Sequence, residues 1–288
     1  MLFHCKTILK NTLLIFFFIG VYFPKNGFAQ QKTLYKKIDT TQLFLKKINP
    51  IDFDHSKKYP AMVFFFGGGW TKGSINQFKP HAEYFSKRGM VCFLVDYRVS
   101  SRHQSTPFES LKDAKSAIRF IRKNAQEFAV DTSKIIGAGG SAGGQLAAAA
   151  ALIEKYNEET DDVSISSKPN ALVLFNPAID NGPEGVGFDR VKEDYQNFSP
   201  IHNIKKNAPP TIIFLGTKDD LIPVSTAKLY QSKMVENGNV CELHLYENAK
   251  HGFFNYNKFE NYKSTVLKTN AFLISLGYLT KQPEIELK

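Results

Sequence analysis

The sequence predicts an α/β domain with a mostly parallel central sheet covered by helices on both faces. Short apolar runs alternate along the chain with longer segments whose apolar residues recur at helical spacing. This alternation is typical of parallel strands joined by crossover helices. Two stretches of polar and apolar alternation, roughly Tyr35 to Asp39 and Gln42 to Ile48, are joined by a Thr-Thr step and predict an antiparallel edge hairpin.

The remaining elements follow in order. The run Ala61 to Phe66 ends in three glycines and does not alternate, which indicates a strand buried on both faces. We expect further strands at 91–95, 134–138, 171–175, 211–215 and 240–246. Helices are expected at 79–88, 108–128, 141–155, 224–237 and 259–276. The segment 177–210 interrupts this order, and its length indicates a small functional insertion or lid.

The first 29 residues have the composition of a signal peptide. Lys6 and Lys10 precede an apolar run from Leu13 to Phe23, and small residues precede Gln30. A membrane-spanning helix needs roughly 20 residues, about twice this run, so we expect cleavage and export to the periplasm or medium in preference to an anchor. No linker-like stretch interrupts residues 30–288, which predicts a single domain there.

Composition disfavours several other kinds of site. The formal net charge is +10, but the lysines are scattered and form no arginine stripe, which disfavours nucleic-acid binding. No later stretch is apolar enough to span a membrane, and no metal-binding motif or Cys/His cluster is present in the sequence. Cys92 and Cys241 lie in apolar strand-like runs and are expected to be free core thiols. We predict no metal and no cofactor, and make no prediction of oligomeric state.

The segment Gly139-Gly140-Ser141-Ala142-Gly143 matches the G-x-S-x-G pattern of a nucleophilic serine. It follows a predicted strand and opens a predicted helix, where a tight turn needs small flanking residues. The helix N-terminus would favour developing negative charge. The alternatives are a glycine-rich turn with an incidental serine and a phosphate loop. The lysine of G-x-x-x-x-G-K is missing, and the placement between strand and helix favours the nucleophile. We therefore predict that Ser141 is a nucleophile.

A glycine loop supplies the expected partner of such a serine. Gly67-Gly68-Gly69-Trp70 directly follows a buried strand, and acyl transfer needs backbone amides that bind the oxyanion of the tetrahedral intermediate. We predict the amides of Gly68, Gly69 and Ala142 as these donors. Trp70, the only tryptophan, is a candidate for the wall of the substrate pocket.

A base and an orienting acid follow in chain order. His251 comes after the last predicted strand, where a short loop returns a side chain to the sheet edge, whereas the other histidines lack this placement. Asp219 and Asp220 follow the preceding strand. Either would give the order Ser, Asp, His that is expected of this strand arrangement.

Taken together, these motifs resemble those of the α/β-hydrolase superfamily, near the hormone-sensitive-lipase-like esterases and the acetyl and feruloyl esterases. The resemblance implies an α/β-hydrolase fold, and it favours Asp219 over Asp220 because the family acid stands two residues before the leucine of Leu-Ile-Pro. Many relatives have histidine where this chain has Phe66, and the lipase-like members have a helical N-terminal cap. The shared segments span residues 60–255 and are Gly67-Gly68-Gly69-Trp70, Asp96-Tyr97-Arg98, Gly139 to Gly143, Ser199-Pro200, Gly216 to Asp219 with Pro223, and His251-Gly252-Phe253.

The expected function is that of a secreted serine esterase with the triad Ser141, Asp219 and His251. Short or aromatic acyl esters are the expected substrates, including acetylated or feruloylated polysaccharide. Two alternatives remain open from sequence. One is an amide or peptide hydrolase like the dipeptidyl-peptidases or formamidases, although the chain has no room for a propeller domain. The other is a binding protein on a hydrolase fold that has lost activity.

Overall fold

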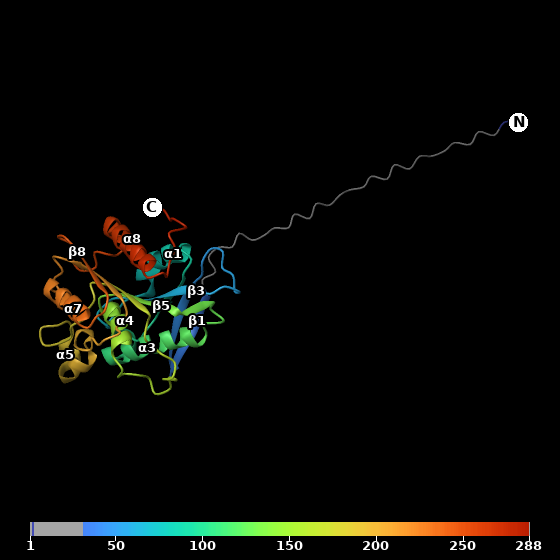
Figure 1. Ribbon diagram of the computed structural model, residues 1–288. Helices are drawn as coiled ribbons and strands as arrows, with labels where there is room; N and C mark the ends of the chain where they lie inside the picture. Colours follow the sequence, from blue (N-terminus) through green and yellow to red (C-terminus); the bar gives the residue numbers. More distant parts are fainter. Residues whose placement is uncertain (1, 3–30, 288) are drawn as a thin grey trace.

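The computed structural model describes residue 2 and residues 31–287 (Figure 1). The predicted signal peptide, residues 1–29, therefore lies outside the described residues except for residue 2. Within the described ranges, no helix has the length and apolar character needed to cross a membrane.

A single eight-stranded sheet forms the centre of the molecule, in the order β1-β2-β4-β3-β5-β6-β7-β8. β1 pairs antiparallel with β2, and β2 with β4, while every later pair is parallel. This arrangement confirms the predicted fold class and the antiparallel edge hairpin. The strands are β1 (Gln31–Ile38), β2 (Thr41–Ile48), β3 (Tyr59–Phe65), β4 (Val91–Val95), β5 (Val130–Gly140), β6 (Ala171–Phe175), β7 (Thr211–Gly216) and β8 (Cys241–Tyr246).

Helices cover both faces of the sheet, as predicted. α1 (Lys79–Lys87) and α8 (Phe259–Ser275) lie on one face, and α3 (Pro107–Lys123), α4 (Ala142–Leu152) and α7 (Val224–Glu236) lie on the other (Figure 1). Two separate apolar clusters result, one under each layer. The central strands are buried on both faces, which explains their continuous apolar sequences.

Element boundaries differ in places from the sequence predictions. The hairpin turns at Asp39-Thr40 and not at a Thr-Thr step, because Asp39 adopts a φ of +46°, a conformation that Asp accepts more readily than Thr. β5 begins four residues before the predicted 134. The insertion 177–210 holds two one-turn α-helices, α5 (Phe188–Val191) and α6 (Tyr195–Phe198), and the short α2 (Ser100–His103) was not predicted.

Cys92 of β4 and Cys241 of β8 are free and buried, as expected. Burial raises the pKa of the Cys241 thiol to about 12 and that of Cys92 further still. These thiols therefore stay protonated and serve as small core side chains.

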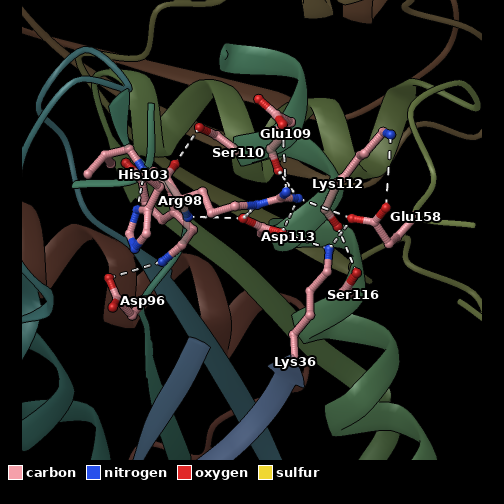
Figure 2. Close-up of polar contacts among 12 residues, drawn as sticks. Lys36, Asp96, Arg98, His103, Glu109, Ser110, Lys112, Asp113, Ser116 and Glu158 are labelled. Atoms are coloured by element: carbon pink, nitrogen blue, oxygen red, sulfur yellow. Dashed lines mark hydrogen bonds and ion pairs between the residues drawn. The ribbon is translucent and has the colours of Figure 1, made fainter. Parts of the chain in front are cut away.

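A buried ionic network attaches the hairpin to the rest of the domain (Figure 2). The fully buried Asp113 of α3 accepts from Lys36 Nζ at 2.7 Å and from Arg98 Nε and Nη2 at 2.8 Å each. Glu158 Oε2 contacts the same two cations at 2.7 and 3.1 Å. The arginine of the Asp96-Tyr97-Arg98 segment is thus a structural residue that joins β1, the end of β4 and α3.

Candidate active site

Ser141 stands at the sharp turn between β5 and α4. Its φ is +54° and its ψ −121°, a conformation that is costly for a non-glycine residue, and its N–H donates to Phe175 O at 2.9 Å. The turn is possible because Gly143 packs directly on β3: a Cβ there would lie 2.1 Å from Phe65 O. The chain therefore presents the Ser141 hydroxyl at the carboxyl edge of the sheet.

Three predicted side chains meet at this edge. His251 Nε2 lies 3.0 Å from Ser141 Oγ, and His251 Nδ1 lies 2.9 and 3.0 Å from the two carboxylate oxygens of Asp219. The Asp219 side chain is 0% exposed and that of His251 is 21% exposed. A carboxylate at Nδ1 holds the proton on that nitrogen, which leaves Nε2 free to accept the proton of Ser141.

Asp219, and not its neighbour, is the carboxylate that contacts the histidine. Its Oδ1 also accepts from the backbone N–H groups of Leu221 and Ile222 at 3.0 and 2.9 Å. Asp220 is exposed to solvent. The placement agrees with the preference for Asp219 that the family resemblance implied.

Asn176 is a site residue that the sequence analysis missed. This fully buried side chain places Nδ2 3.4 Å from His251 Nε2, and its Oδ1 accepts from Gly252 N at 3.0 Å. Its amide and the Ser141 hydroxyl both offer donors to Nε2, which favours the tautomer with an unprotonated Nε2. The sequence did contain a signal for this residue: Asn176 is polar and directly follows the buried strand β6, at the same edge of the sheet as Ser141.

The glycine loop lies against the nucleophile. A Cβ on Gly67 would come within 3.3 Å of Ser141 Cβ and 2.9 Å of Gly140 O. Gly67 N–H donates to Gln77 Oε1 at 2.7 Å, so this amide is not available to bind an oxyanion. Within residues 31–287, the amides of Gly68 and Gly69 have no backbone or side-chain acceptor, and Ala142, as the first residue of α4, has none within the helix. The three predicted oxyanion donors are thus available.

Trp70, which we predicted as a candidate for the wall of the substrate pocket, is instead buried in the structure. Its indole is 1% exposed, and Nε1 donates to Gln145 Oε1 of α4 at 3.3 Å. The Arg190 guanidinium lies 5.0 Å from the ring centroid, and Phe198 meets the ring edge-on at 6.1 Å. The insertion 177–210 buries this side chain, and only the tertiary fold brings that segment here.

The insertion also contacts the glycine loop directly. Arg190 Nη1 donates to the Gly69 carbonyl and lies 3.2 Å from Thr71 Oγ1. Tyr97 contacts the start of the same loop, where its hydroxyl donates to Phe66 O at 2.6 Å and its ring stacks on the Phe66 ring at 4.1 Å. The loop is therefore held by contacts along its length.

Two larger cavities of the described chain lie away from this site. One of 490 Å³ is lined by the end of α4, by residues of the segment 153–168 that follows it and by residues 203–208, with two side chains of α3, Lys115 and Arg119. The other, of 510 Å³, lies beside the hairpin and is lined by Phe44, Asp96 and Arg102 among others. Ser141 lines neither. Residues 31–287 bring together no group of three or more His, Cys, Asp or Glu side chains that could hold a metal ion.

The fold and this side-chain arrangement define a class of protein. A strand-to-helix serine, a histidine after the last strand and an acid after the preceding strand, on a mostly parallel sheet, are the features of an α/β-hydrolase. Comparison with known proteins agrees: the BD-FAE family matches residues 49–181. A solved esterase that is 42% identical is matched over 97% of its length, and the chain therefore belongs to the esterases of the α/β-hydrolase superfamily.

Solved structures of esterase 2 from Thermogutta terrifontis are similar over nearly the whole domain. The form phosphoramylated by tabun is 42% identical, with a TM-score of 0.84, over 88% of this chain and 97% of that one. The same esterase has been solved with propionate and with butyrate bound, at 41% and 40% identity.

Curated relatives are more distant and longer. Esterase LipC of Mycobacterium tuberculosis is 30% identical over 220 residues, which are 69% of this chain and 54% of LipC. The acetylxylan esterase of Xylanibacter ruminicola is 25% identical over 67% of this chain and 41% of its own length. This chain therefore spans about half the length of the curated relatives that it matches.

Proposed function

We propose that this chain is a serine carboxylesterase that hydrolyses esters through an acyl-enzyme on Ser141. The observation that carries the proposal is the continuous contact from Ser141 Oγ through His251 to Asp219, at 3.0 and 2.9 Å. Both distances lie within hydrogen-bond reach, which is what proton transfer during attack requires. The likeness to esterases of the same fold supports this activity.

In the first half of the reaction, Ser141 Oγ attacks the acyl carbon and His251 Nε2 takes its proton. Asp219 stabilises the imidazolium that forms, and the Gly68, Gly69 and Ala142 amides bind the oxyanion. His251 then gives the proton to the leaving alcohol as the C–O bond breaks. In the second half, water attacks the acyl-enzyme by the same route, releasing the acid and restoring Ser141.

We propose short-chain acyl esters as the preferred substrates, with aromatic acyl esters also accepted, and acetylated or feruloylated polysaccharide as the natural source of the two kinds of ester. The related esterase that binds propionate and butyrate supports the acyl length, and the acetylxylan esterase relative supports the polysaccharide. The signal-like first 29 residues motivate export, which detection of a mature chain beginning at Gln30 would test.

The activity is tested with Ser141→Ala and the p-nitrophenyl esters of acetate, butyrate, octanoate and decanoate. We expect the variant to fold normally, to lose nearly all turnover, and to escape labelling by a fluorophosphonate probe. Unchanged turnover in the variant would refute the serine mechanism. A rate that rises toward decanoate would refute the short-chain preference. If the enzyme releases neither acetate nor ferulate from substituted xylan, the proposal of a polysaccharide substrate is refuted.

A further inference from the structure

Gln77 lies between the two loops that would carry out catalysis. Its Oε1 accepts from Gly67 N at 2.7 Å, at the start of the glycine loop. Its Nε2 donates to Asn255 Oδ1 at 3.0 Å, four residues beyond the candidate base. Gln77 and Asn255 are 178 positions apart in the sequence, so this contact exists only in the folded chain.

From Asn255 the hydrogen bonds continue to the candidate base. Asn255 Nδ2 donates to Gly252 O at 2.8 Å, and Gly252 N donates to Asn176 Oδ1 at 3.0 Å. Asn176 Nδ2 then lies 3.4 Å from His251 Nε2. Three side-chain amides thus form one chain of contacts from the glycine loop to the imidazole.

Each amide in this chain has its orientation determined by a backbone group. Gly67 N–H can only donate, so the oxygen of Gln77 must face it and the NH₂ group must face Asn255. The Gly252 carbonyl can only accept, so the NH₂ group of Asn255 faces Gly252 and its oxygen faces Gln77. An apolar side chain at either position would break the connection.

Apolar packing holds both amides in place. Gln77 belongs to the short 3₁₀ helix Ile75–Phe78, which is capped where Asn76 N donates to Ser74 Oγ at 3.2 Å. The next residue, Phe78, is buried and stacks on Phe254 at 5.5 Å. Because Phe254 directly precedes Asn255, the ring stack and the amide contact bring the same two segments together.

We propose that Gln77 and Asn255 are positioning residues that hold the glycine loop and the histidine loop in register. Gln77 binds the backbone N–H of Gly67, the first residue of the glycine loop. This contact fixes the position of the two amides that follow, those of Gly68 and Gly69, relative to His251. The side chain of Phe66, which stands where many relatives have histidine, has no polar atom that could hold the glycine loop in this way. The inference rests on the proposed esterase function and adds how its donors are aligned with its base.

The test uses Gln77→Met, Asn255→Ala and the double variant, with Asn76→Met as the matched control. Asn76 is an exposed amide in the same 3₁₀ helix. We expect kcat for p-nitrophenyl acetate to fall about 10- to 100-fold in both single variants, because misplacement of about 1 Å has effects of this size. KM should stay unchanged, and the double variant should lose no more than the worse single one.

A second readout separates alignment from general loss of structure. Ser141 Oγ attacks the phosphorus of paraoxon while His251 takes its proton, and the P–O bond to 4-nitrophenolate breaks. The negative charge that grows on the phosphoryl oxygen needs the oxyanion donors, whereas the sulfur of parathion is a weaker hydrogen-bond acceptor. We expect the ratio of the paraoxon rate to the parathion rate to fall in the Gln77 and Asn255 variants and to stay unchanged in Asn76→Met.

Three outcomes would overturn the inference: a wild-type kcat in both single variants, an equal loss of both organophosphate rates, or losses that multiply in the double variant. If Gln77→Met does not fold, as judged by its thermal melt, Asn255→Ala tests the same contact from the other loop. Failure of the proposed function itself would differ, since the wild-type protein would then neither hydrolyse esters nor react with paraoxon.

Discussion

The carboxylate of Asp219 contacts Nδ1 of His251 with both of its oxygens, at 2.9 and 3.0 Å. The adjacent Asp220 has the same charge but is exposed. Because Leu221 N and Ile222 N donate to Oδ1 of Asp219, an asparagine at this position would keep its oxygen there and turn its NH₂ group toward His251. That donor would place the imidazole proton on Nε2, where it blocks acceptance from Ser141.

We therefore predict that Asp219→Asn lowers kcat by about 10⁴-fold with a normal thermal melt, the size of the effect seen when a triad acid is replaced this way. Asp220→Asn is the matched control and should keep wild-type kcat. Steady-state hydrolysis of p-nitrophenyl acetate measures both. A large loss in Asp220→Asn with little in Asp219→Asn would reverse the assignment.

The contact between Arg190 and the Gly69 carbonyl predicts that the insertion supports the glycine loop. Loss of this contact frees the loop that carries the oxyanion donors, and misplacement of about 1 Å can cost about 100-fold in rate, so Arg190→Met should lower kcat at least about tenfold. Lys192→Met removes the same charge from an exposed side chain two residues away and should leave kcat unchanged. Equal activity of the two variants would show that the loop does not depend on the insertion.

His81 predicts a specific pH dependence of stability. The side chain is fully buried among aromatic rings, neither ring nitrogen has a partner within the described residues, and burial lowers its pKa from 6.5 to about 3. The native state thus keeps His81 neutral, while the unfolded state takes up a proton below pH 6.5. Stability is unaffected above pH 6.5 and is lost as the pH falls from there toward 3.

His81→Phe should remove this loss. Relative to the wild-type protein, its free energy of unfolding should rise as the pH is lowered from 7 to 5, by at most about 1.4 kcal/mol per pH unit. Urea unfolding at pH 7, 6 and 5 measures the difference, with the exposed His55→Phe as control. Parallel stability curves for wild type and His81→Phe would contradict the prediction.

The ionic network of Figure 2 predicts unequal roles for two nearby arginines. Arg98→Met leaves the buried Asp113 without two side-chain donors, and breaking a buried pair in this way costs about 3–5 kcal/mol. Arg102 also pairs with a carboxylate, Asp96 at 2.7 Å, but its side chain is 42% exposed. Arg102→Met should therefore cost no more than about 1 kcal/mol. Equal urea midpoints for the two variants would refute this difference.

Much of the fold could be predicted because local patterns and the global structure agree. The continuous apolar runs correctly predicted the strands β3, β4 and β6, and the helical spacing of apolar residues correctly predicted the helices α3 and α8. The glycines around Ser141 predicted a turn that only small residues permit. Where the hairpin turn was wrong, the backbone preference of a single residue, Asp39, decided its position.

Chain order and local motif thus determined the fold class, the glycine loop, Ser141 and His251, since these depend on which residue follows which strand. Local sequence left Asp219 and Asp220 open, the family resemblance favoured Asp219, and the tertiary structure places Asp219 against His251 and exposes Asp220. The tertiary structure alone decided that the insertion buries Trp70 and that Gln77 meets Asn255 across 178 positions. The physical reason is that side-chain contacts between distant segments depend on how the helices and loops pack on the sheet, and no local pattern encodes that packing.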